Sequence, residues 1–184
     1  MLSTRELTGR ARRLGDDVNT DYIIASTRKR DTLDEKLLAR YLLETLDPRF
    51  ADSVRPGDIL VAGRNFGCGS AMEIAVTVIL AAGIRAVVAQ SFARTFYRNA
   101  INNGLIPAEC DTASIAEGDT ITLRFGDDRG EVENARSGAV MVARPMPPFL
   151  HDILNAGGLV DYLRGRRAQS LRDSNTRVAP RGVV

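Results

Sequence analysis

The sequence predicts an α/β fold with a mixed, partly parallel sheet, flanking helices and a β-rich C-terminal half. Two strand–turn–helix units follow one another, with apolar strands expected at 59–62 and 85–89. Such units imply parallel strands joined by right-handed crossovers. The pattern changes near Asp111, after which short alternating segments dominate. At 184 residues and 44% hydrophobic content, the chain is large enough for one domain with a real core.

The N-terminal part predicts a strand, an acidic turn and a basic loop. Residues 9–14 form the first candidate strand, and residues 15–21 are dense in turn formers and acidic groups. A short apolar stretch follows at 22–24. The charged residues 27–31 then predict an exposed loop.

An amphipathic helix is expected over residues 32–44. Thr32 and Glu35 have the spacing of a capping box. The apolar residues that the helical period puts on one face are Leu33, Leu37, Leu38, Tyr41 and Leu42.

Each strand–turn–helix unit has its own start and stop signals. The first helix is expected over 70–83, because Ser70 and Glu73 form a capping box and a glycine ends the segment. The second is expected over 91–103, capped by its first serine and stopped by the glycine that follows. The chain then returns to the sheet at 105–108.

The C-terminal half predicts further short strands and a last helix. The strands are expected at 119–125, 131–134 and 138–143. A turn is expected at 126–130, and a helix over 147–157 begins with two prolines and ends with two glycines. We expect residues 1–164 to form a single domain. Residues 165–184 are polar, Arg-rich and non-periodic, which predicts a flexible tail.

Composition narrows the function classes. The 25 Lys and Arg residues against 23 Asp and Glu residues leave a net charge of +2, which argues against nucleic acid as a partner. The sequence contains neither an apolar run long enough to span a bilayer nor a secretory signal, so we expect no membrane association and a cytoplasmic location. Two distant cysteines and a single histidine do not form a metal site.

The turn at 65–70, Asn-Phe-Gly-Cys-Gly-Ser, connects an apolar strand to the helix expected from Ser70. A glycine turn at a helix start directs free backbone N–H groups and the positive end of the helix dipole at one point. The sequence therefore predicts an anion-binding site at this turn.

Three ordered motifs, at 15–24, 65–70 and 91–105, resemble the small subunit of 3-isopropylmalate dehydratase, and residues 149–163 resemble the C-terminal segment of that family. The similarity covers most of residues 9–164. It implies a β/β/α swivelling domain of the aconitase superfamily that closes over a large partner subunit carrying a [4Fe-4S] cluster, with no cofactor bound by this chain. The implied chemistry is the removal and re-addition of water on a hydroxy di- or tricarboxylic acid.

The resemblance also implies roles for individual residues. Ser70 matches the serine whose alkoxide takes a proton beside a carboxylate, a role that requires nearby N–H donors. Spacing alone would make Ser70 only a helix N-cap. Asp21 matches an acidic residue near the active site, although an Asx-turn is the alternative in so polar a stretch.

The basic loop is the candidate specificity element. In the family, this loop contacts the variable group of the substrate. Arg30, and Arg28 beside it, would give that contact a charge suited to a carboxylate rather than to an isopropyl group. The alternative is that this basic run is a solvated surface.

The chain departs from the family pattern directly after Gly69 and Ser70. Where the family reads Gly-Ser-Ser-Arg-Glu, this sequence carries Ala71 and Met72 in place of the second serine and the arginine. Those two family side chains hold a substrate carboxylate. Three hypotheses follow: the substrate presents a different group there, the basic loop supplies the missing charge through Arg28, Lys29 or Arg30, or the chain is an assembly paralogue without activity. Intact Ser70 and Asp21 favour a changed substrate.

Two other functions compete with a hydro-lyase subunit. One is a stand-alone anion- or nucleotide-binding module built on the glycine turn. Its turn, however, lacks the third glycine of a dinucleotide site and the lysine of a P-loop. The other is a purely structural role in an assembly.

Overall fold

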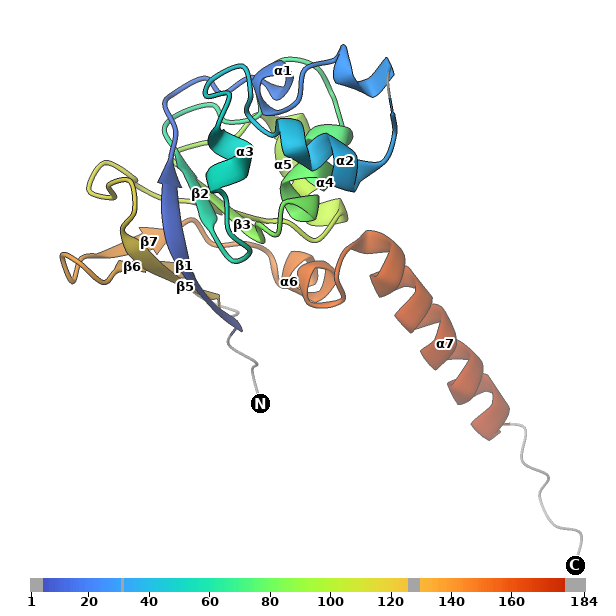
Figure 1. Ribbon diagram of the computed structural model, residues 1–184. Coiled ribbons are helices and arrows are strands. Elements are labelled where there is room, and N and C mark those ends of the chain that lie inside the picture. Colours follow the sequence, from blue (N-terminus) through green and yellow to red (C-terminus); the bar gives the residue numbers. More distant parts are fainter. Residues whose placement is uncertain (1–4, 31, 126–129, 178–184) are drawn as a thin grey trace, which may run out of the picture.

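The protein is built on one mixed sheet, described by a computed structural model that covers residues 5–30, 32–125 and 130–177. The strands lie in the order β4-β3-β2-β1-β5-β6-β7 (Figure 1). Their bounds are Arg5–Arg13 for β1, Ile59–Ala62 for β2, Ala86–Ala89 for β3, Ile106–Glu109 for β4, Thr120–Phe125 for β5, Gly130–Asn134 for β6 and Val140–Ala143 for β7.

Strand β1 joins a parallel half of the sheet to an antiparallel half. On one edge it pairs in parallel with β2, with Ala11 opposite Ile59, and β2, β3 and β4 continue in parallel. On the other edge it pairs antiparallel with β5, with Leu7 opposite Leu123, and the antiparallel pairing continues through β6 and β7. The predicted mixed sheet with a β-rich C-terminal half is therefore confirmed.

Helices flank this sheet, and the last one projects from the body of the molecule (Figure 1). The α-helices are α1 Thr20–Ile23, α2 Glu35–Leu38, α3 Phe50–Ser53, α4 Ile74–Ala81, α5 Arg94–Asn102, α6 Pro148–Asn155 and α7 Leu159–Arg177. The 3-10 turns are η1 Arg28–Arg30 and η2 Ala39–Tyr41.

Two apolar clusters form the core, one on each face of the parallel strands. In β2, Leu60 belongs to the cluster that includes α4, whereas Ile59 and Val61 belong to the cluster that includes α6. Successive side chains of a strand point to opposite faces, so a strand buried on both sides has to be apolar throughout. This explains the continuous apolar runs in β2 and β3.

The helix expected over 32–44 is wrong in extent and in its cap. It is divided into α2 and η2, and Asp34 rather than Thr32 caps α2 by accepting hydrogen bonds from the amides of Lys36 and Leu37. Leu33 lies outside the helix and is 78% exposed, while Leu38 is buried. A serine, threonine or aspartate can each cap a helix, so spacing alone does not select among them.

Both predicted serine caps are also wrong. Helix α4 begins at Ile74 after Glu73, not at Ser70, and no side chain caps it. Helix α5 begins at Arg94. The hydroxyl of Ser91 instead accepts a hydrogen bond from the amide of Asn65, so this serine ties two loops together.

The segment from 165, expected to be an irregular tail, continues helix α7 as far as Arg177. Its part from 166 to 172 contains three arginines with one Ala, one Gln and one Leu, and these residues have high helix propensity. Most side chains between 161 and 172 are exposed, which explains why no apolar period was visible. Residues 178–184, and 126–129 of the expected turn, lie outside the described residues. The domain boundary at 164 stays a prediction.

In the described part of the chain, none of the helices is both long enough and apolar enough to cross a membrane.

Candidate active site

The candidate site lies where the parallel strands β1 and β2 end at the same edge of the sheet. Loop 14–19 follows β1, and loop 63–73 follows β2. In parallel sheets, ligands bind outside the carboxyl ends of the strands. Three amides donate hydrogen bonds between the two loops, each at 2.8 Å: Asp17 to the carbonyl of Arg64, Gly67 to that of Val18, and Thr20 to that of Cys68. The structure thus joins the first two sequence motifs.

Ser70 is held through its backbone and leaves its hydroxyl free. Its carbonyl accepts hydrogen bonds from the Thr20 hydroxyl at 3.0 Å and from the Met72 amide at 2.8 Å. The side chain is exposed, and the Ser70 hydroxyl makes no hydrogen bond to the described residues. Because α4 begins only at Ile74, the dipole of that helix does not act directly on Ser70.

The amides of Ser70 and Ala71 are also without a hydrogen-bond partner among the described residues. Ala71 is exposed at the surface of the turn. These two N–H groups are the local donors that can stabilise negative charge close to Ser70. The donors that the structure offers at the expected anion site are therefore turn amides rather than a helix end.

Asp21 lies in the first turn of α1, next to the residue that caps this helix. The amide of Asp21 donates to Oδ1 of Asn19 at 2.9 Å. Oδ1 of Asp21 is buried, and it has no hydrogen-bond partner among the described residues. A buried carboxylate oxygen without a donor is costly, so it is a candidate acceptor for a group that does not belong to this chain.

The two glycines of the turn are required by geometry. Gly67 has φ +77° and a Cβ there would lie 2.2 Å from the ring of Phe96. Gly69 has φ +94° and a Cβ there would lie 2.3 Å from Oδ1 of Asn19. Gly69 therefore allows the turn to approach the cap of α1. Phe66 packs edge-on against Phe96 with ring centroids 5.0 Å apart, which supports the turn from below.

The basic loop forms η1, and its three cations have different surroundings. Arg28 donates two hydrogen bonds of 2.8 Å to the Glu44 carboxylate, and its guanidinium lies 3.9 Å from the centre of the Tyr41 ring. Arg30 is exposed, and its guanidinium makes no polar contact with the described residues. The structure therefore holds Arg28 against the protein and leaves Arg30 at the surface.

Lys29 is the loop residue that reaches the glycine turn. Its Nζ atom donates to Sδ of Met72 at 3.0 Å, and Met72 is buried. The sequence indicates Arg28 and Arg30 as substrate-binding residues and gives Lys29 only as one of three loop cations that could supply the missing charge. The short-range pattern of three consecutive cations gives no signal for which of them points to residue 72.

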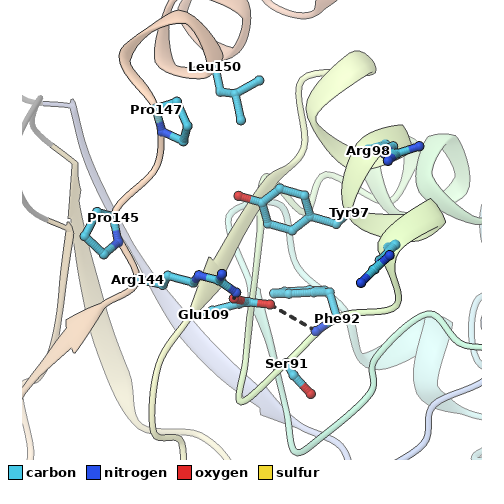
Figure 2. Close-up of a pocket in the computed structure, with 10 residues that line it drawn as sticks. Ser91, Phe92, Tyr97, Arg98, Glu109, Arg144, Pro145, Pro147 and Leu150 are labelled. Atoms are coloured by element: carbon cyan, nitrogen blue, oxygen red, sulfur yellow. Dashed lines mark hydrogen bonds and ion pairs between the residues drawn. The ribbon is translucent and has the colours of Figure 1, made fainter.

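A pocket lies beside the site, and its lining comes mainly from α5, the loop before it and the chain after β7. It has a volume of about 610 Å³. Figure 2 shows its lining residues, which are Ser91, Phe92, Arg94, Tyr97, Arg98, Glu109, Arg144, Pro145, Pro147 and Leu150. Arg94 and Arg98 thus face one pocket. Glu109 pairs with Arg144 at 3.0 Å and accepts from the Phe92 amide. Burial, with the nearby Glu109, raises the pKa of Tyr97.

Within the ranges that the structure describes, the histidine, cysteine and acidic side chains do not gather into any group of three or more that could hold a metal ion. Cys68 lies in the glycine turn, and Cys110 lies beyond the end of β4. Both are free thiols.

The chain matches known proteins over nearly its whole length. The model of the aconitase C-terminal domain matches residues 20–113. The 3-isopropylmalate dehydratase small subunit of Heliobacterium modesticaldum is 44% identical over 166 residues, which are 89% of this chain and 98% of that protein. The isopropylmalate/citramalate isomerase small subunit of Methanocaldococcus jannaschii is 42% identical over 89% of this chain and 97% of its own length.

A solved structure has the same fold. The crystal structure of 3-isopropylmalate dehydratase from Methanocaldococcus jannaschii superposes with a TM-score of 0.84 at 40% identity. The match covers 92% of this chain and 99% of that one. The mixed sheet and its flanking helices are therefore shared with a protein of known structure.

Proposed function

The chain belongs to the family of 3-isopropylmalate dehydratase small subunits, which are aconitase-type hydro-lyases, and from this membership we propose a mechanism and a substrate class. In the mechanism, Ser70 is the base that takes a proton from the carbon beside a substrate carboxylate and returns it when water is added back. The substrate class is a 2- or 3-hydroxy di- or tricarboxylic acid.

The observation that carries this proposal is the state of Ser70. Its backbone is held by Thr20 and Met72, while its hydroxyl is exposed and makes no contact with the described residues. An alkoxide is a strong base only if donors stabilise its negative charge. The free amides of Ser70 and Ala71 are the donors that this chain offers for that purpose.

Asp21 has a supporting role in this proposal. Its buried Oδ1 atom accepts a hydrogen bond from a donor outside the chain, either the substrate hydroxyl or a cationic side chain of the partner subunit. Asp21 thereby orients the charged groups near the reacting carbon. Its position in α1 is supported by the Asn19 cap.

The two arginines of the loop divide their roles. Arg30 is free to contact the variable end of the substrate, and a guanidinium suits a carboxylate at that end. Arg28 lies in the same loop but is already paired with Glu44, so its contribution is to fix the conformation of the loop. Gly69 allows the close approach of the turn, and Ala71 and Met72 line the substrate side of it.

We assign the [4Fe-4S] cluster to a large partner subunit. The side chains that this chain presents in the described ranges do not make a cluster site. When present, the cluster supplies a Lewis acid to the reaction. The relatives are named as small subunits, which supports the existence of such a partner.

The test is a complex reconstituted with a large subunit of this family. We expect Ser70→Ala to abolish turnover of hydroxy acids and to leave assembly, measured by size-exclusion chromatography, unchanged. Ser137→Ala, in the turn between β6 and β7, is the matched control and should keep full activity. Near-normal turnover of Ser70→Ala would exclude this base, and a complex inactive on every hydroxy acid would favour a structural role.

A further inference from the structure

We propose that Lys29 binds the substrate carboxylate next to the carbon that Ser70 deprotonates, an inference that rests on the proposed function. The Lys29 ammonium lies 3.0 Å from the sulfur of Met72. Met72 belongs to the same turn as Ser70, because its amide donates to the Ser70 carbonyl at 2.8 Å. A cation is therefore placed at the turn that carries the base.

The contact with Met72 leaves this cation unneutralised. A thioether sulfur is a weak, uncharged acceptor, whereas an ammonium has three donors. No carboxylate in the described ranges lies within ion-pair distance of Lys29, whose side chain is only partly exposed. Partial burial removes some of the water that would otherwise solvate the charge. An anion that binds beside Lys29 can supply the missing acceptors.

The neighbouring cations do not meet this need. Arg28 donates hydrogen bonds from Nε and from Nη2 to the carboxylate of Glu44. Arg30 makes no hydrogen bond to the turn in the described ranges, and Arg64 is paired with Asp16. Lys29 is thus the positive charge that the fold brings to residue 72.

The pair of Lys29 and Met72 also defines what kind of substrate fits. A lysine ammonium is a compact point charge that binds one carboxylate oxygen without the two-pronged geometry that an arginine imposes. The buried thioether beside it forms an apolar wall. This combination suits a hydroxy dicarboxylate with a small alkyl substituent near the bound carboxylate, such as a methyl-substituted malate.

Kinetics of the assembled complex test the assignment. With citramalate as substrate, we expect Lys29→Met to raise KM roughly 10- to 100-fold, the range for loss of one charge-assisted hydrogen bond, and to lower kcat less. Lys29→Arg should retain most of the affinity. Lys36→Met removes the other lysine of the chain, which is exposed on α2, and should leave the KM for citramalate unchanged. The double variant Lys29→Met with Met72→Arg should recover affinity, because it returns a cation to the same place.

Chemical labelling gives a second reading that does not need turnover. The chain contains only two lysines, Lys29 and the exposed Lys36 of α2, so each can be followed by mass spectrometry. We expect citramalate to slow acetylation of Lys29 in the complex and to leave acetylation of Lys36 unchanged. Equal labelling of Lys29 with and without citramalate, or an unchanged KM in Lys29→Met, would overturn the inference while leaving the role of Ser70 intact. Protection of Lys29 in a complex that turns over no hydroxy acid would instead refute the proposed function alone.

Discussion

The hydroxyl of Thr20 donates to the backbone carbonyl of Ser70 at 3.0 Å, across 50 positions of sequence. Thr20 is 1% exposed and is the first residue of α1. Its amide also donates to the carbonyl of Cys68, so a single residue holds the glycine turn at two of its carbonyl groups. The position of the proposed base therefore depends on the first motif of the chain as well as on its own turn.

Replacing the Thr20 hydroxyl should lower the kcat of the complex strongly and the free energy of unfolding only slightly. In Thr20→Val the shape is kept but the hydrogen bond is lost. The Ser70 carbonyl retains its bond from the Met72 amide, so we expect the free energy of unfolding to fall by only about 1 kcal/mol. The kcat of the complex should fall further, because Ser70 is no longer held. Thr20→Ser keeps the hydroxyl and is the control; equal kcat in both variants would mean that this contact does not position Ser70.

An alanine substitution should reduce stability more at Gly69 than at Gly57, which has a similar backbone conformation. Gly69 has φ +94° and Gly57 has φ +91°, so both have a left-handed backbone. A Cβ at position 69 would lie 2.3 Å from Oδ1 of Asn19, whereas a Cβ at position 57 would have no atom within 4 Å. Gly57→Ala should therefore cost about 1–2 kcal/mol of stability from the backbone alone and leave activity unchanged. Gly69→Ala should lose more stability in urea unfolding and should also displace the Asn19 cap, which would reduce turnover. Equal losses in the two variants would show that the close approach is unimportant.

The sequence was sufficient for features that depend on local pattern. The buried strands β2 and β3 are continuous apolar runs, so their existence and their parallel pairing were predicted correctly. The existence of strands β5 to β7 was also predicted, whereas their antiparallel pairing comes from the structure. Helix caps were not, because several polar residues near a helix start are equally able to cap it. Asp34 replaces Thr32 in this role, and Ser70 does not cap α4.

Contacts between distant segments were beyond sequence reasoning. The sequence placed Thr20 and Ser70 in separate motifs, and only the sheet brings the ends of β1 and β2 together. The choice of Lys29 over Arg28 depends on Glu44, sixteen positions away, which pairs with Arg28. A run of like charges carries no information on which member is paired elsewhere.

The two cysteines should differ in reactivity. Burial raises the pKa of Cys110 to about 12, with the nearby charge of Asp111 adding to the effect, so at neutral pH this thiol stays protonated. Only a thiolate reacts rapidly with alkylating agents. We expect iodoacetamide at pH 7.5 to modify the half-buried Cys68 first, followed by mass spectrometry of the peptides. The variant Cys68→Ala should then take up label only on unfolding; rapid labelling of the folded variant would contradict the burial of Cys110.

The stability of the fold should depend on pH through Asp58, which is 3% exposed beneath β1. Burial alone would raise the pKa of Asp58, but hydrogen bonds from Arg10 and from the Arg55 amide outweigh it, so the pKa lies below the usual value. A carboxyl whose pKa is lower in the folded state stabilises the fold above its unfolded pKa of about 3.9, and this contribution is lost as the pH falls through the folded value. The wild-type protein should therefore become steeply less stable in acid.

The variant Asp58→Asn isolates this contribution. At pH 7 this variant leaves the guanidinium of Arg10 without its carboxylate, while the buried Arg12 keeps Glu117 as a partner. The free energy of unfolding should therefore fall by less than the value of about 3–5 kcal/mol that is expected for an isolated buried charge. Urea unfolding at several pH values should show a constant gap between the unfolding free energies of wild type and variant from pH 7 to about pH 5. The gap should narrow as the pH falls below about 3.9, since protonation then removes the Asp58 charge from the wild type as well. Asp161→Asn, in the exposed pair with Arg164, should match the wild type throughout. A gap that stays constant below about pH 3.9 as well would mean that Asp58 stabilises the fold by shape and neutral hydrogen bonds rather than by its charge.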